Sequence, residues 1–262
     1  MPVTSSVPIV DLTTEEFGKL DYRVMSHAFA SQNAIGRLAD EIVYHRDLEN
    51  RLKDAGFQVQ REVAVTIHFD CFQKRFCLDL LVAGEAIYEL KAVPALTDWH
   101  QAQLLNYLLM LDLAHGKLLN FKSPKVDSRF VNNSNSLSKR QAFAVSADSH
   151  CGCHAFRELV INLLRDWGTG LSIGLYQQAL LQLLGGDDKV LRSIPMKRDR
   201  CDLGQQRFAM IDDESAFRIT AFSDATNEYT RQLRKLLAHS VLKRVEWVNI
   251  SIDRATFNTV SR

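Results

Sequence analysis

The sequence predicts a mixed α/β (α+β) protein with an α-β-β-β-α-β core, followed by a second, degenerate copy of the same core. Three observations lead to this prediction. Residues 78–91 have the pattern of a β-hairpin, and apolar residues recur at helical spacing on both sides of it. A stretch near the C-terminus also aligns with part of the first half at a constant offset.

The hairpin is two β-prone runs around a short turn centred on Gly84. If the chain folds there, Asp79 lies opposite Glu89, and Lys91 shares their face because side chains alternate along a strand. Opposed carboxylates, with Cβ atoms roughly 4.5–5.5 Å apart, repel and require a cation or a proton between them. Either Lys91 supplies the cation on a solvated edge hairpin, or the oxygens bind Mg²⁺.

The elements before the hairpin are helices and a strand. Residues up to about Leu12 are expected to form a flexible lead, and residues 13–16 have capping-box spacing, so a helix starts there. Periodicity then predicts helices over 22–33 and 38–55 and a strand over 59–68. The next strand, over 74–82, is the first strand of the hairpin.

After the hairpin, Thr97 is expected to cap a helix that runs to about Leu113, with Gly116 as its C-terminal stop. Residues 117–121 are expected to form a fourth strand. Gln103 and Tyr107 are four residues apart and therefore share one helix face. They are either rim residues of an ordinary amphipathic helix or neighbours of a functional site.

Composition places the chain in the soluble globular class, with 46% hydrophobic and 24% charged residues. The 32 Lys+Arg and 31 Asp+Glu leave a net charge of +1, so a nucleic-acid site must be a local basic patch. No run of about 18 apolar residues and no signal-peptide pattern occurs, so we expect a cytoplasmic protein without a membrane segment.

Five cysteines are too few and too irregularly spaced for a disulfide framework, so reduced thiols are expected. The stretch His150-Cys151-Gly152-Cys153-His154 holds four possible zinc ligands, but no second Cys/His pair at finger spacing accompanies it. It is either an interdomain loop or a metal site.

Asp79 followed by Glu89-Leu90-Lys91 resembles the D…ExK signature of the PD-(D/E)XK nuclease superfamily. Over about the first half, the chain is more closely similar to the GxxExxY proteins of that superfamily, at residues 36–44, 55–57, 101–107 and 118–121. One departure is Leu38, which stands where such proteins have a glycine. The resemblance implies a restriction-endonuclease-like core.

The same resemblance implies an Mg²⁺-dependent (or Mn²⁺-dependent) nuclease that hydrolyses nucleic acid, DNA rather than RNA. The implied catalytic residues are Asp79, Glu89, Lys91, Glu41, Gln103 and Tyr107, and the implied metal ligands are Asp79, Glu89, the Leu90 carbonyl and Glu41. The alternative is a catalytically inactive nucleic-acid-binding or regulatory protein on this scaffold. In that case Glu41 is a surface charge paired with a base such as His45 or Arg37.

Three segments are predicted: a nuclease-like domain over 13–122, a polar and basic linker over 123–150, and a degenerate pseudo-nuclease-like domain over 151–262. Residues 219–249 align without a gap to residues 90–120 at an offset of 129.

A second match, at an offset of 132, aligns residues 168–176 with residues 36–44. At these two offsets the acidic and basic positions of the first half are all replaced. The aligned residues are Ile173 for Glu41, Phe208 for Asp79, Arg218 for Glu89 and Thr220 for Lys91. We therefore expect one metal site per chain, in an internal pseudo-dimer or a homodimer.

Overall fold

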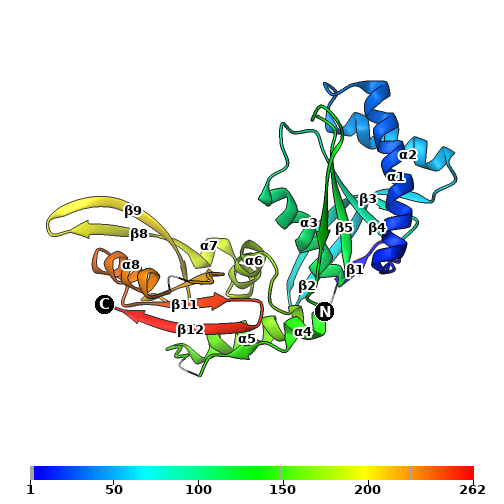
Figure 1. The fold of residues 1–262 in the computed structure, drawn as a ribbon. Helices are drawn as coiled ribbons and strands as arrows, with labels where there is room; N and C mark the ends of the chain where they lie inside the picture. Colours follow the sequence, from blue (N-terminus) through cyan, green and yellow to red (C-terminus); the bar gives the residue numbers. More distant parts are fainter. Residues whose placement is uncertain (1–2, 148, 225) are drawn as a thin grey trace. The chain divides into compact units, whose positions relative to one another are not determined.

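The computed structural model describes residues 3–147, 149–224 and 226–262, which form two compact units (Figure 1). Among the described residues, the N-terminal unit comprises 3–67 and 74–136, and the C-terminal unit comprises 68–73, 137–147, 149–224 and 226–262. Within the described residues, each sheet has six strands. None of the described helices is long and apolar enough to cross a membrane.

The N-terminal unit has a sheet with the order β1-β2-β3-β4-β5-β6, in which β4 and β5 are parallel. Its elements are β1 (Val3–Ser5), α1 (Thr14–Ile35), α2 (Glu41–Asp54), β2 (Val59–Phe69), β3 (Phe72–Val82), β4 (Ala86–Lys91), α3 (Asp98–Leu111), β5 (His115–Asn120) and β6 (Asp127–Asn132). From α2 to β5 this is the predicted α-β-β-β-α-β core.

The N-terminal helix α1 starts with the predicted capping box. The Thr13 side chain accepts from the Glu16 amide at 3.3 Å, and the Glu16 carboxylate accepts from the Thr13 amide at 3.0 Å. The prediction of a flexible lead was wrong for residues 3–5, which form β1 and pair antiparallel with β2. The reason is the exposed edge of β2, whose unpaired backbone groups β1 satisfies.

The β3–β4 hairpin has the predicted register, with Leu81 opposite Ile87, and its turn residues Ala83 and Gly84 take φ values of 59° and 73°. A solvated edge hairpin is excluded because β4 lies between β3 and β5. One face of β4 packs on the cluster formed by α1 and α2, which includes Tyr88 and Leu90. The residues from Ala86 to Leu90 are all buried, so the other face of β4 is covered as well, as in a central strand.

The second core helix, α3, ends earlier than predicted. Its last residue is Leu111, and Asp112 closes it in the left-handed conformation with φ of 54°. Gly116, the predicted stop, lies instead in β5, where a Cβ atom would come within 3.2 Å of the Leu104 and Leu108 side chains. A side chain at this position would press against α3, so the glycine favours the close approach of α3 to β5.

Leu38 lies in the connection between α1 and α2 and is 90% exposed. The turn itself is made by Gly36, whose φ of 81° favours glycine. The leucine therefore leaves the turn unaffected.

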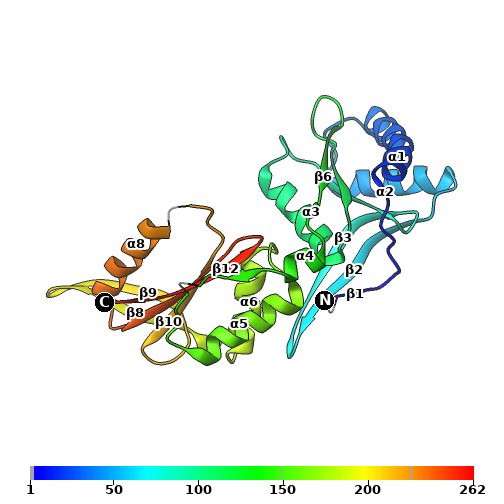
Figure 2. The same ribbon diagram turned by 60° about the horizontal axis from the view of Figure 1, so that its bottom comes forward.

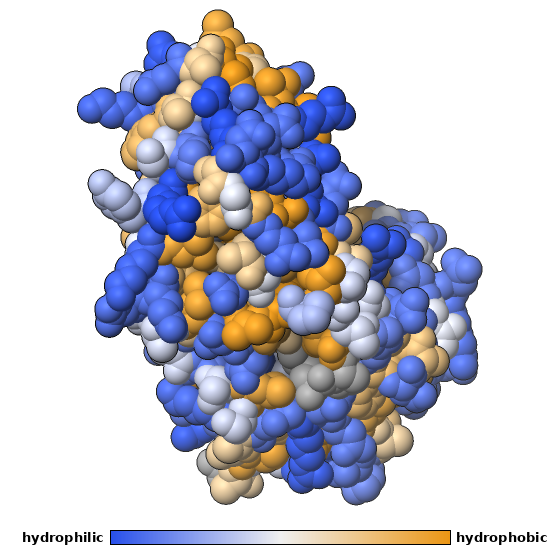
Figure 3. All heavy atoms as spheres, turned by 90° about the vertical axis from the view of Figure 1, so that its right-hand side faces the viewer, coloured by the Kyte–Doolittle hydropathy of each residue, from blue (hydrophilic) through white to orange (hydrophobic). Residues whose placement is uncertain are grey.

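On the face drawn in Figure 3, hydrophobic side chains lie in patches among hydrophilic ones.

The segment expected as a linker contains regular structure. Residues 127–132 form β6, which pairs antiparallel with β5, and α4 (Leu137–Gln141) and β7 (Ala144–Val145) follow. The polar composition of β6 fits an edge strand, most of whose side chains are not buried.

The C-terminal unit is a similar α/β unit, with the sheet order β7-β12-β11-β10-β9-β8 (Figure 2). Its remaining elements are α5 (His154–Trp167), α6 (Ile173–Leu183), α7 (Asp187–Val190), β8 (Leu191–Arg198), β9 (Cys201–Met210), β10 (Ser215–Thr220), α8 (Thr226–Ala238), β11 (Arg244–Ile250) and β12 (Arg254–Ser261). The parallel pair is β10 and β11, each with an antiparallel neighbour outside it. The predicted fold class is confirmed for both units.

The strand registers of the two units coincide at the offset of 129. Leu80 pairs with Tyr88 in the N-terminal unit, and Ala209 pairs with Phe217 in the C-terminal unit. Between the parallel strands, Lys91 pairs with Asn120, and its counterpart pair is Thr220 and Asn249.

Asparagine side chains hold the same loop in both units. Asn120 Nδ2 donates to the Val93 carbonyl at 2.9 Å, and its Oδ1 accepts from the Val93 amide at 3.0 Å. Asn249 makes the same two bonds to Phe222, at 2.9 Å and 2.8 Å. Each asparagine therefore clamps the chain that leaves the central parallel strand.

Buried tyrosines hold the turns that precede the helices α2 and α6. The Tyr44 hydroxyl donates to the Gly36 carbonyl at 2.7 Å, and the Tyr176 hydroxyl donates to the Gly168 carbonyl at 2.6 Å. Burial raises the pKa of Tyr176, so its hydroxyl keeps the proton that it donates.

We expect Tyr44→Phe and Tyr176→Phe each to reduce the free energy of unfolding by about 1–3 kcal/mol, because each leaves a carbonyl without its donor. Tyr22, which is 81% exposed, provides the matched control, and Tyr22→Phe should change stability by less than about 0.5 kcal/mol. Denaturant titration of the three variants measures this, and equal effects would contradict the assigned role.

Candidate active site

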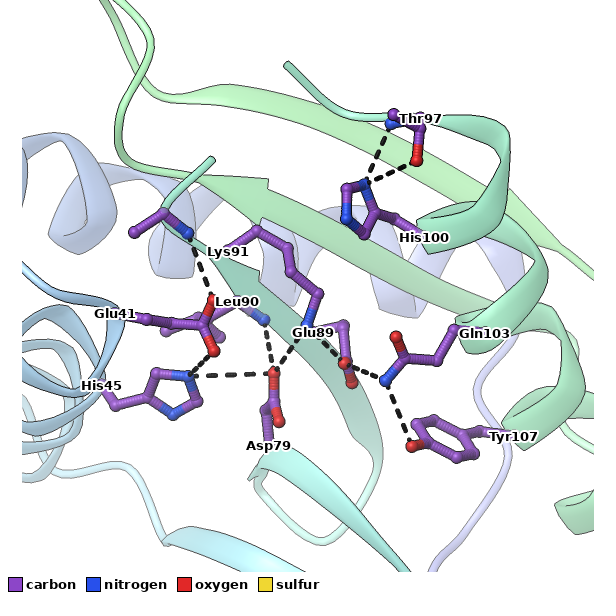
Figure 4. A network of polar contacts seen from close by, with 11 residues as sticks. Glu41, His45, Asp79, Glu89, Leu90, Lys91, Thr97, His100, Gln103 and Tyr107 are labelled. Carbon is purple, nitrogen blue, oxygen red and sulfur yellow. Dashed lines mark hydrogen bonds and ion pairs between the residues drawn. The ribbon is translucent and has the colours of Figure 1, made fainter. Parts of the chain in front are cut away.

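Polar side chains from two strands and two helices converge at the C-terminal end of β4 (Figure 4). They come from α2 (Glu41 and His45), β3 (Asp79), β4 (Glu89 and Lys91) and α3 (Gln103 and Tyr107). The structure thus brings together the six side chains that the family resemblance implied as catalytic, although they lie up to 66 residues apart in the chain.

Glu89 is the most buried member, with 1% of its surface exposed. Its Oε1 accepts from Lys91 Nζ at 2.7 Å and from Gln103 Nε2 at 2.6 Å. Its Oε2 is also buried and has no hydrogen-bond partner among the described residues. Burial and the charge of Asp79 raise the pKa of Glu89 to about 7.

Lys91 supplies the positive charge that the sequence argument required between the two acids. Its Nζ lies 3.7 Å from Asp79 Oδ2 as well as 2.7 Å from Glu89 Oε1. Burial opposes the charge on Lys91, but the neighbouring carboxylates outweigh burial and raise its pKa. Lys91 is therefore a cation at neutral pH.

Two carboxylates are held by backbone amides at the end of β4. Asp79 Oδ2 accepts from the Leu90 amide at 2.9 Å, and Glu41 Oε2 accepts from the Ala92 amide at 3.2 Å. The side chain of Leu90 is buried in the core cluster beneath the site. These bonds fix the positions of the acids relative to β4.

His45 is a site residue that the sequence argument treated only as a partner of Glu41. Its Nε2 lies 3.8 Å from Glu41 Oε1 and 3.8 Å from Asp79 Oδ2. One ligand atom from each of the three residues lies within 4.8 Å of the others, which suits a metal ion. The four-residue spacing of Glu41 and His45, which puts both on one helix face, was the signal in the sequence.

The ionisation of His45 favours this role. Burial lowers the pKa of His45, although Asp79 and Glu41 act in the opposite direction. A neutral imidazole has a free nitrogen lone pair, which a metal ligand needs.

The helix α3 closes the other side of the site. Gln103 Nε2 also donates to the Tyr107 hydroxyl at 3.3 Å, so the predicted pair does share one face. Burial raises the pKa of Tyr107, which keeps its hydroxyl protonated.

His100 lies nearby, in the first turn of α3, where its ring accepts a hydrogen bond from the Thr97 amide at 3.0 Å. Burial and the charge of Lys91 lower the pKa of His100.

The corresponding positions of the C-terminal unit have different chemistry. Phe208, in place of Asp79, is 2% exposed and belongs to the hydrophobic core. Thr220, in place of Lys91, donates to Asn249 Oδ1 at 2.7 Å. These side chains serve packing and loop clamping instead of forming a carboxylate cluster.

The pKa of Glu89 predicts how the metal-free protein responds to pH. The pKa is higher in the folded state, about 7, than the ordinary value of 4.5, so between these values the folded state binds more protons than the unfolded chain. Stability should therefore fall as pH rises through this window. Thermal unfolding in EDTA measures the slope, and Glu89→Gln should flatten it. An unchanged slope in this variant would assign the pH dependence to other groups.

Comparison with known proteins identifies the N-terminal unit. Residues 18–131 match the family model described as the PD-(D/E)XK nuclease superfamily. No curated protein and no solved structure matches the chain. The matched range includes the elements from α2 to β5, most of α1 and β6, and every residue of the candidate site. Residues 18–131 are thus a domain of the PD-(D/E)XK nuclease superfamily, with its restriction-endonuclease-like core.

Proposed function

We propose that the N-terminal unit is a metal-dependent nuclease that hydrolyses phosphodiester bonds, and that its substrate is DNA. The observation that carries the proposal is the Glu89 carboxylate, which is 1% exposed and retains one oxygen without a hydrogen-bond partner among the described residues. A buried acceptor without a donor is costly unless a ligand completes it. A cation beside Asp79 would do so.

The donor set fits a divalent metal. Carboxylate oxygens are ligands for Mg²⁺, whereas an imidazole nitrogen suits a transition metal such as Mn²⁺ better. The residues that would hold the ion are Asp79, Glu89, Glu41, the Leu90 carbonyl and His45. Bound there, a dication supplies a Lewis acid for the scissile phosphate and lowers the pKa of the attacking water.

The chain's own residues contribute the remaining chemistry. Lys91 carries a positive charge 2.7 Å from Glu89 and can stabilise the negative charge that develops on the phosphate oxygens. Gln103 holds the Glu89 carboxylate in place by donating to it at 2.6 Å. The Tyr107 hydroxyl is a protonated donor at the rim of the same site.

The C-terminal unit is, in this proposal, a degenerate copy without a metal site. Support comes from the matched strand registers and from the asparagine and tyrosine bonds that recur at the two sequence offsets. One active site per chain means that a monomer nicks duplex DNA, whereas a homodimer can cut both strands. Nicked circles or direct linearisation of supercoiled plasmid distinguish the two cases.

Substitutions at the site should separate metal binding from rate. Glu89→Gln should weaken metal binding, because a neutral amide oxygen is a poorer ligand for a hard dication. Lys91→Ala should retain metal and lower the cleavage rate about 100- to 1,000-fold, since it removes only transition-state stabilisation. Calorimetry measures metal binding, and a labelled-DNA assay measures cleavage.

The matched control is Glu85→Gln, which changes a carboxylate in the turn of the same hairpin and should leave both properties unchanged. Wild-type cleavage by Asp79→Ala and by Glu89→Gln would refute the nuclease proposal. If the wild-type protein binds metal and nucleic acid but cleaves neither DNA nor RNA, the inactive binding protein becomes the better interpretation.

The imidazole predicts a metal preference. His45→Asn should reduce cleavage with Mn²⁺ more than cleavage with Mg²⁺, because only the transition metal gains from a nitrogen ligand. The ratio of the two rates at saturating metal measures this. Equal reductions would show that His45 acts only by positioning Glu41 and Asp79.

A further inference from the structure

The hairpin of β8 and β9 differs from the rest of the C-terminal sheet because it projects beyond it. We call residues 191–207 the ribbon. The strand β9 pairs with β8 over most of its length, but its pairing with β10 is confined to Ala209 and Met210. The first seven residues of β9 therefore have a neighbouring strand on one side only. Figures 1 and 2 show the ribbon, in yellow, extending past the other strands of its sheet.

The ribbon contacts the rest of its unit along β8 and is exposed along the first seven residues of β9. Ile194 and Met196 pack against the hydrophobic cluster of this unit, and the Lys197 amide donates to the His239 carbonyl at 2.7 Å. Residues 201–207 are all exposed. At roughly 3.3 Å per residue, these seven residues make an arm of about 20 Å.

The exposed stretch is not built for packing. In the N-terminal unit, buried apolar residues of β2 alternate with partly exposed residues, and the buried ones include Val63, Val65 and Ile67. Residues 201–207 show no such alternation, so neither face of this part of β9 is covered. Because isolated two-stranded hairpins are marginally stable in water, an arm of this kind fits a role in contacting a partner.

The charge of the ribbon indicates the partner. Five Lys and Arg residues and two Asp residues lie within 191–207, whereas residues 1–136 carry 14 basic and 17 acidic residues. Arg192 is paired with Asp213 at 2.6 Å. The other four basic side chains are exposed and form no ion pair with any acidic residue that the structure describes: Lys197, Arg198, Arg200 and Arg207.

Protection of the free edge of β8 does not explain these four residues. The edge strand β8 already carries Pro195 and an irregularity between Pro195 and Lys197, both of which discourage further strand pairing. Arg200 lies in the turn and Arg207 on the inner strand β9, where neither can protect that edge.

We propose that the ribbon is a nucleic-acid-binding arm that grips the backbone of duplex DNA. This inference rests on the proposed function, which places nucleic acid on the protein. A two-stranded ribbon fits the major groove of DNA, and unpaired Lys and Arg side chains gain affinity by replacing the counterions of the phosphates. The arm compensates for the absence of excess positive charge in the N-terminal unit.

The test measures binding separately from cleavage. Full-length protein in EDTA is titrated onto a short fluorescent DNA duplex, and anisotropy is followed between about 50 and 200 mM salt. The ribbon variant combines Lys197→Ser, Arg198→Ser, Arg200→Ser and Arg207→Ser. The control variant combines Arg231→Ser, Arg234→Ser, Lys235→Ser and Lys243→Ser, which removes the same charge from exposed positions elsewhere in this unit.

The ribbon variant should bind at least about tenfold more weakly, and its slope of log K against log salt should fall by up to about 3.6, at about 0.9 for each lost phosphate contact. The control variant should change less than about threefold. Equal losses in both variants, no loss in either, or no binding of duplex DNA by the wild type would overturn the proposal. Ribbon-dependent binding of anionic lipid vesicles without binding of DNA would also overturn it.

The outcomes separate this proposal from the proposed function. If the ribbon variant loses DNA binding while the wild type shows no metal-dependent cleavage, the arm stands and the nuclease proposal fails. If the wild type cleaves DNA and the ribbon variant binds as tightly as the control, only the arm is refuted. Circular dichroism of both variants verifies that the exposed substitutions leave the fold intact.

Discussion

The candidate site depends on the burial of the Glu89 carboxylate beside the ammonium group of Lys91. An ionised carboxylate in a protein interior costs several kcal/mol unless its oxygens are satisfied. Lys91 and Gln103 satisfy one oxygen, and the other remains without a partner in the described structure. The raised pKa of Glu89 has the same cause: burial and the charge of Asp79 disfavour the ionised carboxylate, so the group is more easily protonated than an exposed glutamate. The fold thus maintains an incomplete site that a cation can complete.

The sheet explains why this imbalance persists. The strand β4 is central and its residues 86–90 are all buried, so the Glu89 side chain is only 1% exposed. The neighbouring elements attach to the same strand end, since Asp79 binds the Leu90 amide and Glu41 binds the Ala92 amide. The parallel strand β5 continues the sheet beside it, and sites in such sheets lie at the carboxyl ends of the parallel strands. Movement of Asp79 or Glu41 would therefore break a hydrogen bond to the backbone of β4 or the residue after it.

The C-terminal unit separates the scaffold from the chemistry. It has the same order in five of its six strands, the same asparagine clamp and the same tyrosine bond, whereas Phe208 and Thr220 stand at the positions that align with Asp79 and Lys91. A similar fold is therefore stable without the carboxylate cluster, which agrees with the general rule that a fold and the site on it depend on different residues. The projecting β8–β9 ribbon has no apolar alternation over residues 201–207, so this unit also has a surface of a different character.

The sequence by itself determined the local elements and the polar group at β4. Alternation around Gly84 gives the hairpin register, and the capping box gives the start of α1, because both depend on neighbouring residues. The resemblance to the nuclease superfamily added Glu41, which is distant in sequence from the hairpin. The same resemblance added Gln103 and Tyr107 as residues beside the site, but not the contact of Gln103 with Glu89.

Only the tertiary structure decided the features that depend on contacts between distant segments. The pairing of β1 with β2, the role of Gly116 beneath α3, the approach of His45 to Asp79 and the open oxygen of Glu89 all belong to this class. The β8–β9 ribbon belongs to it too, because a strand pattern does not state where pairing with the next strand stops. Sequence periodicity reports which face a residue occupies. Packing between elements decides what that face meets and which polar atoms are left without a partner.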